Sequence, residues 1–145
     1  MLTRLKEDLK AAMRSGDTVR RNTIRLLMAE LKKAQIEKKG ELTDEDAITL
    51  LTREAKKRRE AAEAYRKGDR IELAEGEEGE LRIIEDYLPQ QMTEDEVKAL
   101  IAQIVEAVQP QGMRDMGKVM GQLVPKIRGR FDGKAASGLV RAALA

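Results

Sequence analysis

The chain has 145 residues, enough for one ordinary domain or two small ones, and it contains neither cysteine nor histidine. These absences exclude disulfides, thiolate metal sites, a cysteine nucleophile and an imidazole base. The net charge is only +2, but residues 1–41 carry 11 basic and 6 acidic side chains, residues 71–91 carry 1 and 7, and residues 109–145 carry 7 and 2. The segregation predicts separate basic and acidic surfaces.

No segment is long and apolar enough to span a membrane, and the first residues lack the apolar stretch of a secretory signal. The sequence therefore predicts a cytoplasmic protein without membrane contact. Charged residues make up 37% of the chain and aromatic residues 2%. This composition is typical of long helices packed through aliphatic side chains.

The first helix is predicted by apolar residues at three- and four-residue steps from Leu2 to Met13, and Ser15-Gly16 closes it. Asp17 is an N-cap for a second, long helix that ends at Lys39-Gly40, with the glycine in the left-handed position after the helix. These are the first of a set of longer antiparallel helices expected over residues 1–90.

A third helix is predicted to begin at Thr43 and Asp46, which resemble a capping box, and to end near Gly68. A fourth helix should run toward Leu88, which precedes Pro89. Gly76 and Gly79 predict a bent or frayed segment within it.

The remaining residues predict a smaller unit. Gln90-Gln91-Met92 is expected to be a short linker, and Thr93 with Glu96 forms a second capping box before a regular apolar stripe. A helix from Asp115 to about Val124, an extended loop over 125–131 and a last helix from Asp132 should follow. The fold class is therefore all-α, with an N-terminal antiparallel helical domain over 1–90 and a C-terminal three-helix domain over 91–145.

Two glycines interrupt the helical pattern of this tail. Gly117 and Gly121 each cost about 1 kcal/mol relative to alanine in a helix. Their spacing opens a strip of bare backbone, which either a neighbouring helix of the same domain or a nucleic-acid backbone can approach closely. The first explanation needs only packing, and both remain open.

Five cations surround the two predicted helix starts at Asp115 and Asp132. Because unpaired N–H groups at helix N-termini favour anions, these cations predict a phosphate site. In an extended loop three of them would alternate and project to one side, while Gly129 and Gly133 would let a ligand approach. The alternative is a solvated basic surface. The candidate site comprises Lys118, Lys126, Arg128, Arg130 and Lys134 with Gly117, Gly121, Gly129 and Gly133.

Other charged segments have simpler explanations. The cations between Arg53 and Arg59 alternate with glutamates at helical spacing, so they predict a solvated helix face, and Arg20, Arg21 and Arg25 offer a third basic surface. The acidic run from Glu72 to Asp86 gives only weak support for metal binding. Phe131 is expected to cover the end of the tail core.

The run Asp115-Met-Gly-Lys-Val-Met-Gly, followed by Pro125-Lys126, Gly129 and Asp132-Gly133, resembles the signature of the YqeY family. This domain also forms the C-terminal tail of the B subunit of glutamine-dependent aminoacyl-tRNA amidotransferases. The hinge-like run Tyr87-Leu88-Pro89-Gln90-Gln91-Met92 and the opening helices are similar too. Phe131 and the Gly76–Gly79 pair depart from the family pattern.

The resemblance implies a helical protein whose tail engages tRNA, linked by family to carbon-nitrogen ligation with glutamine as amido-N donor. Since no residue here supports that chemistry, we expect a non-catalytic accessory module that binds tRNA or another structured RNA. No cofactor, metal or catalytic residue is predicted. The alternative is a protein-interaction module that docks on an amidotransferase or another translation protein. An independent enzyme is a third hypothesis, disfavoured by the lack of histidine and cysteine.

Overall fold

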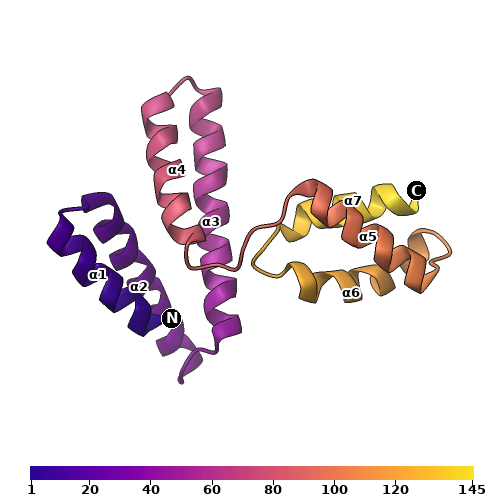
Figure 1. Ribbon diagram of the computed structural model, residues 1–145, viewed down its shortest axis with the longest axis horizontal. Helices are drawn as coiled ribbons and strands as arrows, with labels where there is room; N and C mark the ends of the chain where they lie inside the picture. Colours follow the sequence, from indigo (N-terminus) through magenta and orange to yellow (C-terminus); the bar gives the residue numbers. More distant parts are fainter. The chain divides into compact units, whose positions relative to one another are not determined.

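The computed structural model describes residues 1–145 and contains seven α-helices and one short 3₁₀ helix, without β-strands. The predicted all-α class is confirmed. The chain divides into two compact units, Met1–Pro89 and Gln90–Ala145 (Figure 1). No helix combines the length and the apolar character that a bilayer span requires.

The N-terminal unit consists of two helical hairpins, and Figure 1 shows the distal half of the second hairpin extending beyond the first. Their helices are α1 (Leu2–Ser15), α2 (Thr18–Lys38), α3 (Asp44–Lys67) and α4 (Ile71–Glu85). Aliphatic side chains from all four helices form one buried core, including Leu5, Leu27, Leu51 and Ile84. Each of the four helices therefore buries one apolar face within this unit.

The helix ends follow local side-chain chemistry. Gly16 takes φ +76° after α1, where a left-handed residue costs glycine little. The capping box at α3 is confirmed, since Thr43 accepts from Asp46 N–H and the Asp46 carboxylate accepts from Thr43 N–H. The prediction for α2 was wrong by one residue: Lys39, not Gly40, adopts the left-handed conformation, with φ +60°.

α4 is an uninterrupted helix through Gly76 and Gly79, so the predicted fraying is wrong. Three ion pairs join it to α3: Arg66 Nε lies 2.6 Å from Glu78 Oε1, Arg58 Nε lies 3.4 Å from Glu80 Oε2, and Arg59 pairs with Glu85. These contacts offset the low helix propensity of glycine.

The α3 cations are not all solvated, contrary to the prediction. Arg58 and Glu54 pair with each other and are only 9% and 6% exposed. Lys57 lies 3.3 Å from the same glutamate but stays exposed. Helical spacing correctly predicts the pairing of these residues, but the packing of α4 against α3 decides which pair is buried.

A polar cluster fixes the end of α4 against the first hairpin. The buried Tyr87 hydroxyl donates to Asp8, and the Arg4 guanidinium lies 4.4 Å from the centre of the tyrosine ring. Arg20 approaches Asp86 at 3.4 Å. Burial, followed by the bond to Asp8, raises the pKa of Tyr87. This cluster joins α1, α2 and the residues after α4.

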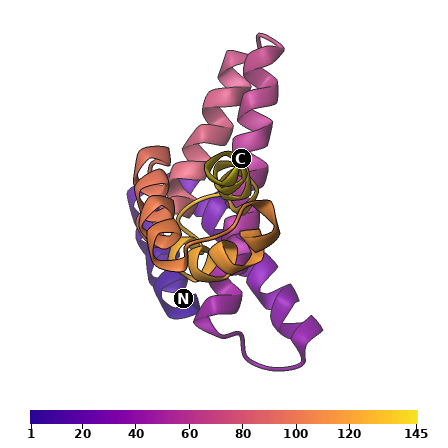
Figure 2. The same ribbon diagram turned by 90° about the vertical axis from the view of Figure 1, so that its right-hand side faces the viewer.

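The tail unit contains α5 (Glu94–Val108), a 3₁₀ turn (Met113–Asp115), α6 (Met116–Ile127) and α7 (Gly133–Leu144). The three α-helices pack on one another in a small bundle (Figure 2). The capping box of Thr93 with Glu96 is confirmed, and Phe131 packs against the core as expected. The buried core comprises Val97, Ile101, Ile104, Val119, Leu123, Ile127, Ala136 and Val140.

The segment predicted as a linker is bonded to the α6–α7 connection. Met92 N–H donates to the Arg130 carbonyl at 2.8 Å, and the Gln91 amide donates to the Gly129 carbonyl at 2.8 Å. Arg130 Nε returns a bond to the Gln90 carbonyl at 2.8 Å. Residues 90–92 therefore belong to the folded tail.

Candidate functional site

The candidate site lies on α6 and the turn that follows it, and the predicted extended loop is wrong. α6 continues through Pro125 to Ile127, where the N–H groups of Arg130 and Phe131 both bond the Ile127 carbonyl. Gly129 takes φ +72° in this tight turn. Lys126, Arg128 and Arg130 therefore do not alternate along one extended strand.

The outer face of α6 carries a row of residues with little or no side chain. Gly117, Gly121 and Pro125 recur every four residues and are all exposed. A Cβ added at either glycine would meet no atom within 4 Å beyond the adjacent backbone of α6, so a tight helix crossing inside the tail does not explain them. Because proline has no N–H, it also leaves the Gly121 carbonyl without its helical donor. The exposed backbone is open to an outside partner.

A cationic row runs beside this strip. Lys118, Gln122 and Lys126 are exposed and also four residues apart, which places them on one side of α6 over roughly 12 Å. The Lys118 side chain is 70% exposed, with its ammonium 3.6 Å from Asp115. Gln122 was not among the predicted site residues, although its spacing of four residues from each lysine predicts that it shares their side of the helix.

The remaining predicted residues lie at the α6–α7 connection and differ in their exposure. Arg128 directly follows α6 and is exposed, whereas Arg130 is half-buried and bonded to Gln90. Gly133 and Lys134 are exposed in the first turn of α7. Gly129 serves the turn rather than a surface, because its φ is positive and its carbonyl accepts from Gln91.

The helix starts are less suited to anions than the sequence predicts. Asp132 caps α7 by accepting from Ala135 N–H at 2.9 Å, so a carboxylate already occupies that terminus. At α6, the Gln111 N–H bonded to Asp115 lowers the pKa of that carboxyl, with Lys118 adding to the effect. Side-chain cations beside exposed glycines, rather than helix termini, define the candidate site.

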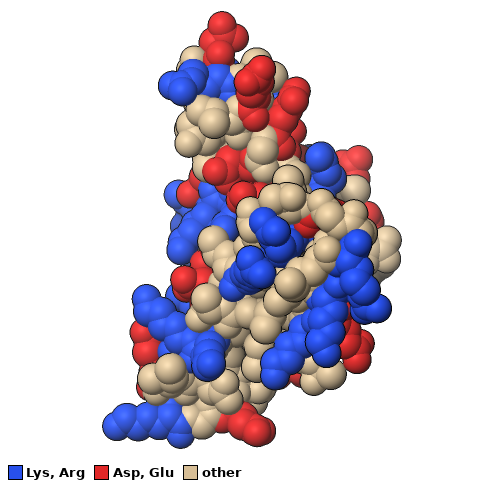
Figure 3. All heavy atoms as spheres, turned by 90° about the vertical axis from the view of Figure 1, so that its left-hand side faces the viewer, with Lys and Arg blue, Asp and Glu red and all other residues tan.

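A second basic surface covers the first hairpin. Figure 3 shows lysine and arginine side chains gathered in groups over the α1–α2 face. Arg20 is engaged with Asp17 and Asp86, and Lys38 with Asp46 at 2.6 Å. Arg20, Arg21 and Arg25 therefore do not contribute equally to this basic surface. Arg25 is exposed, whereas Arg20 is held in ion pairs.

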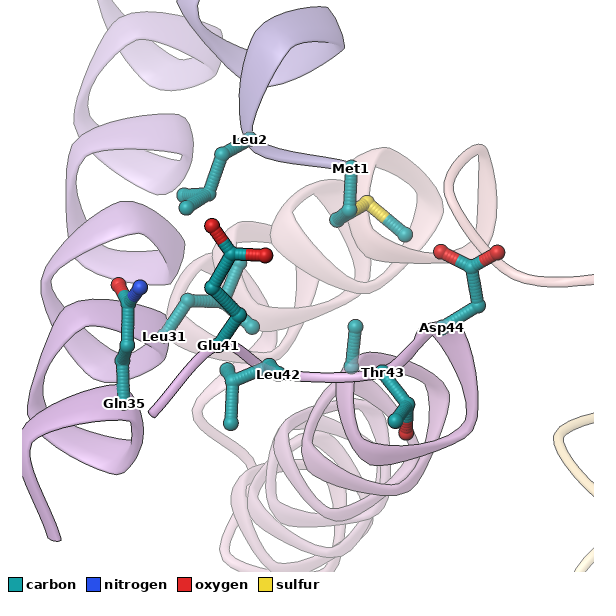
Figure 4. Close-up of a pocket in the computed structure, with 9 residues that line it drawn as sticks. Met1, Leu2, Leu31, Gln35, Glu41, Leu42, Thr43 and Asp44 are labelled. Atoms are coloured by element: carbon teal, nitrogen blue, oxygen red, sulfur yellow. The ribbon is translucent and has the colours of Figure 1, made fainter. Parts of the chain in front are cut away.

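A cavity of about 200 Å³ lies between α2 and the start of α3 (Figure 4). Its walls are mainly aliphatic, and Glu41 and Asp44 supply its carboxylates. The Thr43 hydroxyl is already used as the α3 cap. The lining residues are Met1, Leu2, Leu31, Gln35, Glu41, Leu42, Thr43, Asp44 and Ala47.

Three acidic residues of α4 contribute to the contact between α3 and α4. Glu78, Glu80 and Glu85 are engaged by arginines of α3, and no group of three acidic side chains has the arrangement of a metal site. Arg66 lowers the pKa of Glu78 through its hydrogen bond.

The fold and surface define an all-α protein of two helical units, with a small tail that presents cations beside bare helix backbone. The chain matches the Yqey-like protein family over residues 2–144 and belongs to that family. The membership predicted from the tail signature is thus confirmed.

The relatives of the chain include fungal and archaeal proteins. It is 33% identical over 132 residues to "Altered inheritance of mitochondria protein 41, mitochondrial" of Pyrenophora tritici-repentis, covering 90% of this chain and 72% of that protein. The protein of the same name in Eremothecium gossypii is 30% identical over 149 residues, covering 99% and 80%. A glutamyl-tRNA(Gln) amidotransferase subunit of Thermococcus gammatolerans is 43% identical over 54 residues, which are 34% of this chain and 9% of that protein.

These relatives overturn the cytoplasmic prediction, because several of them are named as mitochondrial proteins. The prediction relied on the absence of apolar segments. Such an absence does not distinguish one aqueous compartment from another.

Proposed function

We propose that this chain is an RNA-binding accessory module whose α6 face contacts the phosphates of tRNA or another structured RNA. The observation that carries the proposal is the pairing of two exposed rows on one helix: Lys118 and Lys126 beside Gly117 and Gly121. Cations neutralise phosphates, and helix backbone without side chains lets the sugar-phosphate chain come close. Sequence readout would be slight, since backbone contacts dominate.

The similarity to a protein named as a glutamyl-tRNA amidotransferase subunit supports tRNA as the RNA class to test first. Lys134 and Arg128 extend the cationic surface at the end of α6. Arg130 is assigned a structural role instead, because its guanidinium bonds the Gln90 carbonyl.

The first test measures the affinity of the full chain for bulk tRNA against salt concentration. In the Lys118→Gln, Lys126→Gln variant, binding should weaken, and the slope of log K against log salt should fall by about 1 for each lost phosphate contact. Lys67→Gln, Lys98→Gln is the matched control, since it removes the same charge from exposed positions elsewhere. Equal losses in both variants would contradict a contact specific to α6.

The second test separates folding from binding. Gly117→Gln and Gly121→Gln meet no neighbour and replace poor helix formers, so each should stabilise the tail by up to about 1 kcal/mol. If RNA lies on this strip, the same variants should bind tRNA more weakly because their side chains hold the phosphates away. A stabilised protein with unchanged tRNA affinity would remove the glycine strip from the proposed interface.

A further inference from the structure

The outer face of α2 carries a hydrophobic seam that nothing within the N-terminal unit covers. The core side of this helix is buried through Ile24, Leu27 and Leu31. On the opposite side a second set of residues recurs at alternating steps of three and four, and every member is exposed. The set comprises Val19, Asn22, Leu26, Ala29, Lys33 and Ile36.

This spacing is the heptad repeat of a coiled coil, with Val19, Leu26 and Lys33 at a positions and Asn22, Ala29 and Ile36 at d positions. Val19, Leu26 and Ile36 are 53%, 40% and 70% exposed, and they are among the few large hydrophobic residues of the chain that face solvent. The stripe extends over roughly 26 Å of helix. A helix laid along it would bury these three side chains.

The flanking charges identify the partner helix. The g positions hold Arg25, Lys32 and Lys39, and the last two e positions hold Glu30 and Glu37. In a parallel pair of identical helices, each g residue faces the e′ residue five positions further along the other helix. Arg25 then faces Glu30′ and Lys32 faces Glu37′, so both pairs are complementary.

The same pattern disfavours an antiparallel pair, in which g faces g′ and e faces e′. Lysine and arginine would then meet one another, as would the glutamates. The polar residues within the seam, Asn22 at d and Lys33 at a, restrict register and number of strands at a cost in affinity.

We propose that α2 pairs with α2 of a second copy of this chain, as a parallel, two-fold symmetric and weakly associating homodimer. The contact is isologous, since the same seam serves both copies. It uses only the N-terminal unit and is independent of the RNA proposal.

The test measures the mass of the full chain in solution by sedimentation equilibrium without RNA. The wild type should shift from monomer to dimer across the micromolar range. Leu26→Gln, Ile36→Gln should weaken the dimer about tenfold or more while the helical circular dichroism stays unchanged, because both side chains are exposed in the monomer. A wild type that stays monomeric throughout, or a variant that still dimerises equally, would overturn the proposal.

Charge exchange tests the pairing itself. Arg25→Glu, Lys32→Glu and Glu30→Lys, Glu37→Lys should each be monomeric alone, because g and e′ then carry the same sign. Mixed in equal amounts, the two variants should form a heterodimer, because each g–e′ pair then joins a glutamate of one variant to a lysine or arginine of the other. Dimers of either variant alone, or a mixture that stays monomeric, would contradict the g–e′ contacts.

Orientation is tested with single thiols, as the chain has no cysteine. Asn22→Cys places the two d-position thiols opposite each other in a parallel, in-register dimer, so mild oxidation should give a disulfide-linked dimer. Glu63→Cys, on exposed α3 surface, should remain monomeric. Equal crosslinking of both variants, or none for Asn22→Cys, would overturn the parallel arrangement.

Discussion

Both units have an aliphatic core, but in the second hairpin charged side chains also line the contact between the helices. In the N-terminal unit, α3 and α4 meet through small residues such as Ala62 and Ala74, with arginine–glutamate pairs along the contact. In the tail, α5, α6 and α7 meet through aliphatic side chains, and the ion pairs of Lys98 with Glu94 and Lys118 with Asp115 stay within a single turn.

This difference separates the roles of charge in the molecule. In the second hairpin, charged side chains are part of the helix contact itself, so a charge change there acts on stability. In the tail, the core is apolar and the cations of α6 contribute little to packing, so a charge change acts on the surface. The tail surface can therefore be varied for binding without loss of fold.

The largest effect is expected from breaking the buried pair in α3. Arg58→Met leaves the Glu54 carboxylate buried with only Lys57 nearby, so the unfolding free energy should fall by about 3–5 kcal/mol. Urea unfolding followed by circular dichroism measures the change. In Arg58→Met, Glu54→Leu both charges are gone, and most of the lost stability should return. If Arg58→Met is as stable as the wild type, the ion pair of Arg58 with Glu54 does not stabilise the fold.

A loss of about 3 kcal/mol is expected from Leu123→Ala in the tail. Leu123 is fully buried in the α6 stripe, and its truncation leaves a cavity in a small core. Native-state hydrogen exchange should show faster exchange in α5–α7 and unchanged protection in α1–α4, because the two units have separate cores. Gln122→Ala, at the adjacent exposed position, is the control. Equal deprotection of α1–α4 would contradict the independence of the units.

Local signals in the sequence were sufficient to predict most of the fold. The two capping boxes at Thr43 and Thr93 mark helix starts correctly, because each depends only on residues three positions apart. Pro125 predicts a helix end, but α6 continues through it. Its missing N–H costs one hydrogen bond near the end of α6, and the helix tolerates this loss.

The candidate site was less predictable, since it depends on contacts between distant residues. The pairing of Arg130 with Gln90 spans 40 residues and has no local signal. Likewise, periodicity places Gly117 and Gly121 on one face of α6, but only the packed bundle shows that no other helix covers them. The sequence identifies the residue types of the site, and the tertiary structure decides which of them remain available.

The smallest effect, about 1 kcal/mol, is expected from Tyr87→Phe, which removes the hydroxyl bonded to Asp8 but keeps the buried ring.

This variant also tests the polar chemistry of the N-terminal unit through pH. Because the pKa of Tyr87 is raised in the folded state, its contribution is complete below the unfolded tyrosine value of about 10 and declines as the pH rises above it. Urea midpoints at about pH 8 and about pH 11 should therefore differ less in Tyr87→Phe than in the wild type. Tyr65→Phe, on the half-exposed side of α3, should retain the wild-type alkaline loss. If Tyr87→Phe loses as much stability at alkaline pH as the wild type, the cluster around Asp8 does not carry this dependence.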